Sequence, residues 1–511
     1  MDRRRFITAA GSAAALGLSA CGGGGDAGAG APAPPAPPAG GPDWGALSSG
    51  LEGGVLLPTS AGYAAAAPVF NAIFDGTQPQ AVVRCASAAD VTATLAFARE
   101  NSLAVAPRSG GHGYTGNSAT TGVVIDVGAM NAIQVDASAG TATIGAGAKL
   151  VDIYDQLASQ GICIPSGSCP TIGIAGITQG GGVGVVDRAY GLTCDRLVSA
   201  QVVLADGSVV ACDATTNADL FWALRGGGGG NFGVVTSLTF STFATSDLTS
   251  FSAGFAWSDA AAVLAAWQAW PQALPDTVWS GLVLGSGGAP GATPSIAVSG
   301  VCIGSAADFA PYWSQFLAAA GAAPVSPSIV TQSFHDTLLW SCDGRSVSQC
   351  HLASETSDGS VGRASFVASS DFFDEPLPSA GIAALLGAVE AIVASEPLAV
   401  IMDLMGGAIA RVAPTDTAFV HRQALFSAQY YISGPVGVPA DAVSQAQVAA
   451  SGLRTTMSAW SSGEAYQNYL DPLLQDWQHA YYGANYDRLV QVKARVDPNQ
   501  VFRQAQGIPP Q

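Results

Sequence analysis

Charged side chains are scarce in this sequence, and basic ones are the scarcer kind. Asp, Glu, Lys and Arg make up only 11% of the 511 residues, against about 25% in an average soluble domain. The 19 basic residues stand against 37 acidic ones, which gives a formal net charge of −18. Because nucleic-acid binding depends on a basic surface that neutralises phosphates, we expect no nucleic-acid partner.

Long apolar runs are also missing, although 49% of the residues are hydrophobic and 63 are glycine. No run of about 18 or more apolar residues follows the N-terminal region. Helical stretches such as Ser258–Leu274 are amphipathic and rich in alanine. The sequence therefore excludes a polytopic membrane protein, and at about 150 residues per domain its length predicts two to three domains.

The N-terminus has the pattern of an export signal. Residues Arg3 to Arg5 precede a weakly hydrophobic run, Thr8–Ala20, that is too short to span a bilayer. The paired arginines resemble a twin-arginine signal, which exports folded proteins, and Leu18-Ser19-Ala20-Cys21 resembles a bacterial lipobox with lipidation at Cys21. We expect a periplasmic or cell-surface lipoprotein that meets the membrane only through its lipid anchor. An ordinary signal peptide and a chance cysteine are the alternatives.

The chain divides into five predicted segments. Residues 1–21 form the signal, and residues 22–43, almost entirely Gly, Ala and Pro, predict a semi-extended tether. Helical and extended patterns alternate along the rest of the chain, which predicts the α+β class. A first domain covers residues 44–245, a second domain with an antiparallel sheet covered by helices spans residues 246–433, and residues 434–511 form a C-terminal segment.

The clearest predicted elements occur in all three of these structured segments. Predicted helices cover Ala88–Glu100, Leu150–Ser159, Asp219–Leu224, Ala307–Ala319, Gly381–Ala394 and Ala484–Val496. Predicted strands cover Leu103–Pro107, Val123–Val127, Ile133–Val135, Thr141–Gly145, Ala200–Ala205, Ser208–Cys212, Ser280–Leu284, Ile296–Ile303 and Leu425–Ile432.

An oxidising export compartment would permit disulfides. Cys342 and Cys350 flank a polar loop and are the most plausible pair. The remaining cysteines are left unassigned, with buried free thiols as the alternative: Cys85, Cys163, Cys194, Cys212 and Cys302.

Two glycine-rich loops carry the candidate site. Pro107–Gly113 follows a predicted strand, and its small residues would let backbone N–H groups converge on a pyrophosphate; a structural tight turn is the alternative. His112 is one of only five histidines and is poorly explained as core packing inside such a turn. The second loop, Ser166–Gly184, contains Cys169, which could share the site through the fold or be a buried thiol. Neither loop is followed at once by a convincing helix, which argues against a nicotinamide-binding Gly-x-Gly-x-x-Gly unit.

Five motifs occur in an order that carries a family resemblance. They are the His112 loop, Cys169-Pro170-Thr171 with its glycine repeat, Tyr190-Gly191-Leu192 followed by Asp195, Arg225-Gly226 to Val234-Val235, and the run from Tyr466-Gln467-Asn468-Tyr469 to Phe502-Arg503. The set resembles the berberine bridge enzyme-like flavoproteins of the vanillyl-alcohol oxidase superfamily. That resemblance covers nearly the whole mature chain. It implies a PCMH-type FAD-binding domain of two α/β subdomains, a substrate domain, and a C-terminal segment that returns to the FAD-binding domain.

For the cofactor, the resemblance implies FAD attached by two covalent bonds, one from His112 to the 8-methyl position and one from Cys169 to carbon 6 of the ring. Such a flavin cannot dissociate, and its raised potential makes it a stronger hydride acceptor. No metal site is expected. The other cofactor-binding candidates are Arg108, Ser109, Gly110, Gly111, Gly113, Gly173, Gly176, Gly180, Gly181, Gly184, Asn231, Val234 and Val235.

For the reaction, the resemblance implies oxidation of a carbohydrate or other secondary alcohol, in which a base takes the hydroxyl proton while a hydride leaves for the flavin. Tyr469 is the first candidate for the base and Tyr466 the alternative, because an extended segment would put them on opposite faces. Either could instead be a packing aromatic. Gln429 matches a position that hydrogen-bonds the base. An aromatic or secondary-metabolite alcohol or amine is the alternative substrate, and a binding lipoprotein without turnover is the alternative function.

Two regions bear on the electron acceptor and the substrate pocket. Ile177 and Thr178 stand where the family often has a histidine and a bulky aliphatic residue, in a region thought to control access of oxygen to the flavin. Both oxygen and another electron acceptor therefore stay open. Residues 416–422, with Phe419 and His421, fit a family stretch that lines the substrate side.

Overall fold

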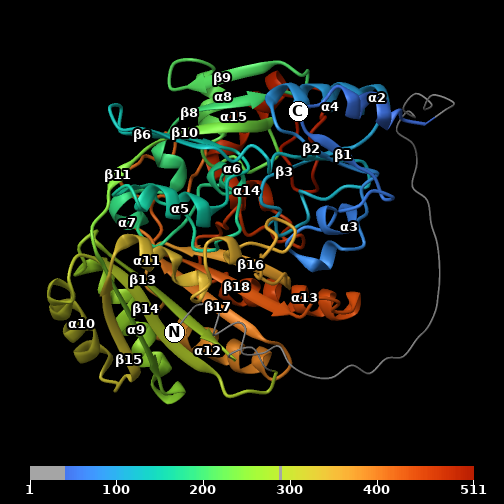
Figure 1. Cartoon of the computed structure of the whole chain (residues 1–511). Helices are drawn as coiled ribbons and strands as arrows, with labels where there is room; N and C mark the ends of the chain where they lie inside the picture. Colours follow the sequence, from blue (N-terminus) through green and yellow to red (C-terminus); the bar gives the residue numbers. More distant parts are fainter. Residues whose placement is uncertain (1–40, 287–289) are drawn as a thin grey trace.

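The computed structural model describes residues 41–286 and 290–511. The predicted signal, the lipidation candidate Cys21 and nearly all of the predicted tether fall outside these ranges. No helix in the described ranges combines the length and the hydrophobicity of a transmembrane span. The described chain forms two packed bodies, one above the other in Figure 1, and its C-terminal residues return to the upper body.

The upper body begins with a small sheet in the order β1-β2-β4-β3, in which β2, β4 and β3 run parallel. Helix α4 (Ala88–Glu100) crosses from β2 to β3, and Ser87 caps it by accepting a hydrogen bond from the amide of Asp90. Strands β2 and β4 are Val-rich and mostly buried, as parallel strands are. The strands are β1 Gly54–Leu56, β2 Ala81–Arg84, β3 Val105–Arg108 and β4 Val123–Asp126.

A second, antiparallel sheet in the order β5-β6-β10-β8-β9 completes the upper body. Its strands are β5 Ile133–Asp136, β6 Thr141–Gly145, β8 Leu197–Val203, β9 Val209–Asp213 and β10 Val234–Ser241. The helices of this part are α5 Leu150–Ala158, α8 Ala218–Ala223 and α15 Tyr486–Val496. Apolar side chains of both sheets and of α15 join one core, so the C-terminal helix closes the body that the first strands begin.

The lower body is one seven-stranded antiparallel sheet in the order β15-β12-β14-β13-β17-β18-β16. Its strands are β12 Leu248–Phe255, β13 Val278–Gly285, β14 Ser295–Ile303, β15 Val325–Gln332, β16 Ser365–Phe373, β17 Leu398–Leu404 and β18 Phe426–Gly434. Helices pack on one face: α9 Ala260–Ala269, α10 Ala306–Ala320, α12 Ser379–Val393 and α13 Ala440–Met457. In β18, Ala428 and Tyr430 face this helical core, whereas Gln429 and Tyr431 line a cavity on the other side. The period of two along a strand thus divides core residues from site residues.

The structure confirms the predicted α+β class, with two α/β subdomains and a helix-covered antiparallel sheet. Helix α13 falls within the segment predicted to return to the upper body, yet it packs against β16 and β18. The return therefore begins after Met457. A short helix, α6 (Ile174–Gln179), stands inside the second glycine loop, where no helix was expected.

The predicted disulfide is present, with an S–S distance of 2.07 Å between Cys342 and Cys350. The other described cysteines carry free thiols: Cys85, Cys163, Cys169, Cys194, Cys212 and Cys302. Helix α11 (Phe334–Leu338) precedes the disulfide and contacts α5, so this part of the lower chain reaches the upper body. The remaining short elements are α2 Trp44–Ser49, α3 Tyr63–Ala66, α7 Asp187–Tyr190, α14 Trp477–Tyr482, β7 Ile162–Cys163 and β11 Phe243–Ala244.

Candidate active site

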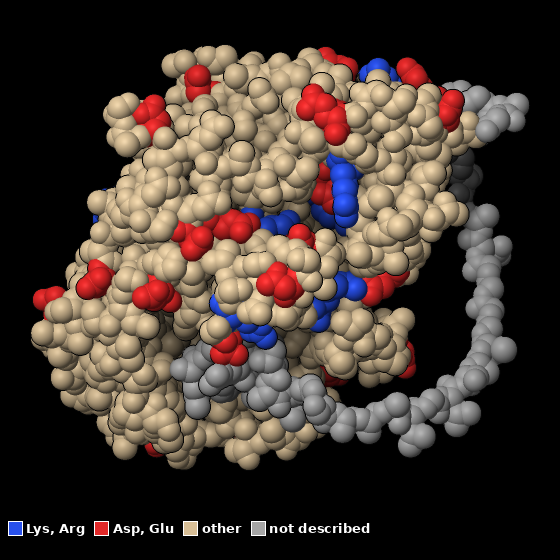
Figure 2. Space-filling view, in the orientation of Figure 1, with Lys and Arg blue, Asp and Glu red and all other residues tan. Residues whose placement is uncertain are grey.

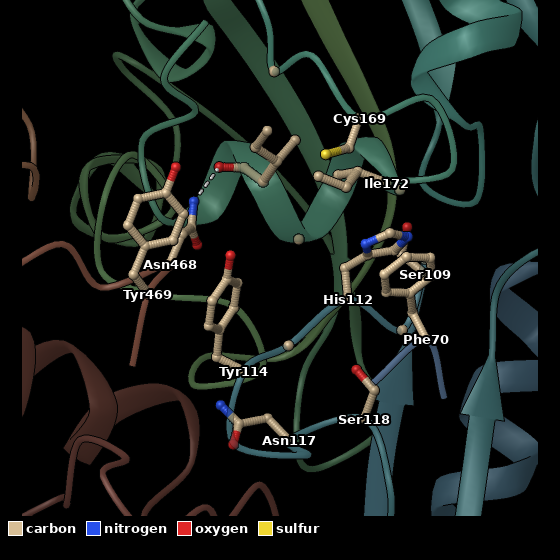
Figure 3. Close-up of a pocket in the computed structure, with 18 of the residues that line it drawn as sticks. Phe70, Ser109, His112, Tyr114, Asn117, Ser118, Cys169, Ile172, Asn468 and Tyr469 are labelled. Carbon is tan, nitrogen blue, oxygen red and sulfur yellow. Dashed lines mark hydrogen bonds between the residues drawn. The ribbon is translucent and has the colours of Figure 1, made fainter. Parts of the chain in front are cut away.

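A cavity of about 590 Å³ lies between the two bodies, within the range of about 300–1,000 Å³ that is usual for ligand sites. Its lining includes the glycine loops of the upper body, the open face of the seven-stranded sheet, the C-terminal turn that contains Tyr469, and parts of residues 340–345 and 361–364. Figure 3 shows His112 and Cys169 on one side of this cavity and Tyr114, Asn468 and Tyr469 on the other. Residues from distant parts of the sequence therefore meet around one ligand volume.

The two glycine loops touch backbone to backbone. A Cβ atom at Gly110 would lie 2.2 Å from the amide nitrogen of Gly173, and one at Gly173 would lie 1.9 Å from the Ser109 hydroxyl. Only glycine fits at either position, because Cβ contacts below 3.0 Å essentially never occur. This close approach brings the loop that carries His112 next to the loop that carries Cys169.

His112 is held from two sides. Its Nε2 lies 2.9 Å from the hydroxyl of Thr171 in the second loop, and its ring stacks on Phe70 with the centroids 3.9 Å apart. Cys169 is a free thiol that is partly exposed to the same cavity. An imidazole and a thiol, the two side chains expected to attach the cofactor, therefore face one ligand volume.

The first glycine loop offers unpaired donors to the cavity. Within residues 41–286 and 290–511, the amides of Gly110, Gly111 and Gly113 donate to no acceptor. The buried guanidinium of Arg108 donates through Nη1 to three backbone carbonyls, while its Nε and Nη2 have no hydrogen-bond partner in the described chain. Converging amides beside a buried cation suit an anionic group such as a pyrophosphate.

The other expected cofactor residues divide into two groups. Those that line the cavity are Gly173, Gly176, Gly184, Asn231, Val234 and Val235. Gly180 and Gly181 instead lie behind its wall: a Cβ atom would meet Asn468 at Gly180 and Phe419 at Gly181. These two glycines let the second loop pack closely against other parts of the chain.

The two tyrosines proposed from the sequence have different surroundings. The buried hydroxyl of Tyr466 accepts hydrogen bonds from the amides of Gly182 (3.0 Å) and Val183 (3.2 Å) and from Asn468 Nδ2 (2.9 Å). Burial also raises the pKa of Tyr466. Tyr469 is only half-buried and lines the cavity. The expected separation onto opposite faces is wrong, because the segment is a turn in which the rings lie 4.8 Å apart.

Gln429 reaches this tyrosine pair through a residue that sequence reasoning missed. Its Nε2 donates to the hydroxyl of Tyr114 at 2.7 Å. The ring of Tyr114 lies 5.3 Å from that of Tyr469. Tyr114 stands two residues after His112, so its place in the same short loop was the signal that could have identified it.

Asp403 is a second lining residue that sequence reasoning missed. It is 3% exposed and lies on β17, whose seven residues are all buried. Its carboxylate nevertheless faces the cavity side of the sheet, beside the ring of Trp279 across Gly281. Since an ionisable group inside an apolar strand is costly to bury, the lone Asp in the sequence Leu398–Leu404 was the available signal.

Residues 416–422, expected to line the substrate side, do not line the cavity in the described chain. Phe419 is fully buried and packs edge-on against Tyr466. The ring of His421 is held between Glu464 (2.6 Å) and Gln467 (3.2 Å). The segment therefore supports the C-terminal turn from behind.

The two residues that depart from the family pattern point in different directions. Ile177 lines the cavity. The hydroxyl of Thr178 is buried and donates to the carbonyl of Ile174 within α6 at 2.7 Å. The wall at this point is thus formed by an aliphatic side chain.

Comparison with known proteins gives matches along most of the chain. Residues 79–213 match the FAD binding domain family, and residues 465–509 match the berberine and berberine like family. YgaK, an FAD-linked oxidoreductase of Bacillus subtilis, is 32% identical over 438 residues, which cover 84% of this chain and 91% of the relative. A chitooligosaccharide oxidase of Gibberella zeae is 30% identical over 454 residues, which cover 85% of this chain and 88% of the relative.

A solved structure, BBE-like 1 of Physcomitrella patens, is similar with a TM-score of 0.82 and 27% sequence identity. The match covers 92% of this chain and 99% of that protein. The likeness therefore includes both bodies.

Proposed function

Because the chain belongs to the berberine bridge enzyme-like family of FAD-linked oxidoreductases, we propose that it oxidises a CH–OH group of a carbohydrate or other secondary alcohol, using a bicovalently bound flavin. The observation that carries this proposal is the composition of one cavity. His112 and Cys169 line it together with Tyr114, Tyr469 and Asp403. The cavity thus combines side chains that could attach a flavin with groups that could accept a proton. Oxidation of an alcohol needs both, because a hydride goes to the flavin and a proton goes to a base.

The residues present fit FAD. The unpaired amides of the first glycine loop would hold the pyrophosphate, and the buried cation of Arg108 beside them would add a favourable charge. Val234 and Val235 line the cavity where the rest of the cofactor would lie, and His112 and Cys169 would attach the ring. When bound, FAD supplies the hydride acceptor.

Tyr469 would take the proton from the substrate hydroxyl. It is partly open to the cavity, and Tyr114, hydrogen-bonded to Gln429, stands beside it. Tyr466 is the poorer base, because its hydroxyl is buried in the wall and burial raises its pKa more than the three hydrogen-bond donors lower it. The buried carboxylate of Asp403 would orient the substrate by accepting a hydrogen bond from a hydroxyl group.

The substrate class is proposed from the relatives and from the cavity wall. The chitooligosaccharide oxidase acts on a carbohydrate by its name, and the wall here combines polar groups with aromatic faces. The aromatic side chains of Tyr114, Phe366 and Tyr431 favour an aromatic or secondary-metabolite alcohol or amine as the second candidate. Electrons would leave to oxygen or to another acceptor.

The cellular setting is also part of the proposal. The arginines before the weakly hydrophobic run and the lipobox-like Cys21 support twin-arginine export and a lipid anchor. A protein exported folded can carry its cofactor with it. The enzyme would then act in the periplasm or at the cell surface on small molecules.

Three measurements test this function. After acid precipitation of the purified protein, the flavin should stay in the yellow pellet; flavin in the supernatant would contradict covalent attachment. Anaerobic mixing with mono- and oligosaccharides, polyols and aromatic alcohols should then bleach the flavin with one class. A flavin that no alcohol bleaches would contradict the oxidation itself. Stopped-flow mixing of the reduced enzyme with oxygen separates an oxidase from a dehydrogenase.

A further inference from the structure

We propose that Lys149 is a positioning residue for the first glycine loop, and that the disulfide-bonded segment of residues 342–355 holds Lys149 in place through Glu355 and His351. The ligand for which the loop is positioned is a dinucleotide pyrophosphate. This inference rests on the proposed function, because the orientation of the loop matters when it holds the phosphates of FAD.

Lys149 occupies an unusual place for a lysine. It is the N-cap residue of α5 and makes no side-chain cap, whereas Ser, Thr, Asp and Asn are preferred there. Its cation stands near the positive end of the helix dipole, which is unfavourable. The residue is also buried, with 8% of its surface exposed. A lysine that opposes three local preferences must be stabilised by its partners.

Those partners join three parts of the chain. The Nζ of Lys149 donates to the carbonyl of Ser109 at 2.9 Å and lies 3.1 Å from Glu355 Oε1. The ring of His351 stands between Glu355 Oε2 (3.5 Å) and Asp152 Oδ1 of α5 (3.0 Å). Positive and negative side chains thus alternate in the order Lys149, Glu355, His351 and Asp152, starting next to the glycine loop and ending on α5.

The charges of this chain of residues support one another. Burial alone would lower the pKa of His351, but its contacts with Asp152 and Glu355 outweigh burial and raise the pKa to about 9. Burial alone would raise the pKa of Glu355, whereas His351 and Lys149 bring it down to about 2. Each charge near neutral pH is therefore paired with an opposite one, which is the condition for burying charged groups.

The bond from Lys149 fixes the direction of one peptide unit. In a trans peptide the C=O and N–H point in opposite directions. Anchoring the carbonyl of Ser109 on Lys149 therefore turns the N–H of Gly110 away from the lysine. That amide has no acceptor in the described ranges, and Gly110 lines the cavity. Lys149 thereby orients a donor before the anion arrives.

The bridged segment supports the same loop by a second route. The disulfide of Cys342 and Cys350 packs against Val151 of α5, and Phe70 rests on this apolar cluster. Phe70 in turn stacks on His112. The bridged segment therefore supports the loop at two points. It holds Lys149, which binds the carbonyl of Ser109, and it packs against Phe70, which stacks on His112.

Four full-length proteins separate positioning from simple stabilisation: the wild type, Lys149→Met, Glu355→Gln and the double variant. Three properties are measured on each: hydrogen exchange of the amides of residues 109–113, FAD content, and Tm. We expect Lys149→Met to speed exchange about tenfold or more and to lower FAD content and Tm, because the loop loses its anchor and Glu355 is left unpaired. In the double variant the unpaired charge is gone, so Tm should recover while exchange stays fast and FAD content stays low.

Recovery of all three properties in the double variant would mean that the pair is only structural, and it would overturn the proposal. Unchanged exchange in Lys149→Met would do the same. Lys149→Arg keeps the cation and its donors, so the amides of residues 109–113 should exchange as slowly as in the wild type. Fast amide exchange in this variant overturns the proposal even if Lys149→Met does not fold. Asp219→Asn, which removes exposed ion pairs with Arg488 and Arg495, is the matched control and should leave exchange in residues 109–113 and FAD content unchanged. A wild type whose flavin no alcohol bleaches contradicts the proposed function alone, since the exchange comparison stands without turnover.

Discussion

At the scale of single residues, the contrast between Tyr466 and Tyr469 decides the proposed chemistry. Both line the cavity, and only three positions separate them. One hydroxyl accepts three hydrogen bonds inside the wall, whereas the other belongs to a half-buried side chain. The two residues should therefore respond differently to the same substitution.

Tyr469→Phe should lower the rate of flavin reduction about 10²- to 10⁴-fold, the usual contribution of a general base, while leaving FAD content and Tm unchanged. Tyr466→Phe should instead cost about 1–3 kcal/mol of stability, because it leaves the buried amides of Gly182 and Val183 without an acceptor. Anaerobic stopped-flow measurement of flavin reduction and thermal unfolding of the two variants check these expectations. The reverse pattern would move the base to Tyr466.

Gly110 tests whether the close contact of the two glycine loops is required. Gly110→Ala places a methyl group 2.2 Å from the backbone of Gly173, so the loops must separate and FAD content should fall. Gly387→Ala is the matched control: it is exposed on α12, nothing lies within 4 Å, and the helix should gain about 0.5–1 kcal/mol. Absorbance at the flavin band per protein reports the outcome. Normal flavin content in Gly110→Ala would show that the contact is dispensable.

The sequence predicted residues that stand in dense local motifs and missed those that the fold brings in. His112 stood out because one of only five histidines is poorly explained as core packing inside a glycine loop, and Cys169 stood out through the family resemblance. Asp403 reaches the cavity only through the register of β17 beside β13 and β18, and no local motif encodes that pairing. The same limit applies to the bond between Gln429 and Tyr114, which joins residues 315 positions apart.

At the scale of elements, the predicted helices start within two residues of their observed positions, with or without a side-chain cap. Helix α4 has its predicted bounds. Helix α10 starts at Ala306, one residue before its predicted start, and a capping box of Ser305 and Asp308 fixes that end. Strands β16 and β17 escaped prediction because they are buried along their whole length, so neither shows polar alternation.

The bridged segment should depend on its disulfide. Replacing Cys342 and Cys350 by serine frees a nine-residue loop and should cost about 2.5 kcal/mol by the loop-entropy relation. Because the disulfide also packs in the cluster that supports Phe70, the visible spectrum of the flavin should shift. Denaturant unfolding and absorbance spectra of the double variant check both effects. An unchanged spectrum with lowered stability would show that the cluster does not reach His112.

The ion pairs of the bridged segment should also shape the dependence of stability on pH. The pKa of His351 is raised from 6.5 to about 9, so its contribution is fully present below pH 6.5 and is lost as pH rises through 9. The pKa of Glu355 is lowered from 4.5 to about 2, so its contribution is present above pH 4.5 and is lost as pH falls through 2. His351→Asn should therefore lower Tm most near pH 5–6 and least above about pH 9.

Thermal unfolding of His351→Asn and wild type from pH 5 to pH 10 measures this difference. His479→Asn alters an exposed histidine and serves as the control. A Tm difference that stays constant across the range would mean that His351 stabilises the fold without its charge.

At the scale of the whole molecule, the few charges are unevenly placed. Figure 2 shows most of the visible Lys and Arg side chains near the middle of the face, whereas many Asp and Glu side chains lie toward its edges. The cavity itself is lined by three arginines and two aspartates: Arg108, Arg345, Arg363, Asp343 and Asp403. Arg363 is paired with Asp75 outside the lining, so the cavity is close to neutral in a chain with a net charge of −18, which would suit an anionic cofactor better than an acidic lining would.

The same net charge sharpens the prediction about the membrane. An acidic protein is repelled by anionic lipid surfaces, so electrostatics offers no second route to the membrane. Only the predicted lipid on Cys21 would hold the enzyme there. Expressed in a Gram-negative host, the wild type should remain in the membrane fraction at high salt and dissolve in detergent, whereas Cys21→Ser should appear in the soluble periplasmic fraction with the same FAD content.

Replacing both Arg3 and Arg4 by lysine separates anchoring from export. If the twin-arginine signal exports the protein, this variant should stay in the cytoplasm, since that route requires the arginine pair. Cys21→Ser that remains bound to the membrane would contradict the lipid anchor, and a lysine variant that still reaches the periplasm would indicate an ordinary secretory signal. In the second case the chain would cross the membrane unfolded, so FAD would have to be bound and attached afterwards, outside the cytoplasm.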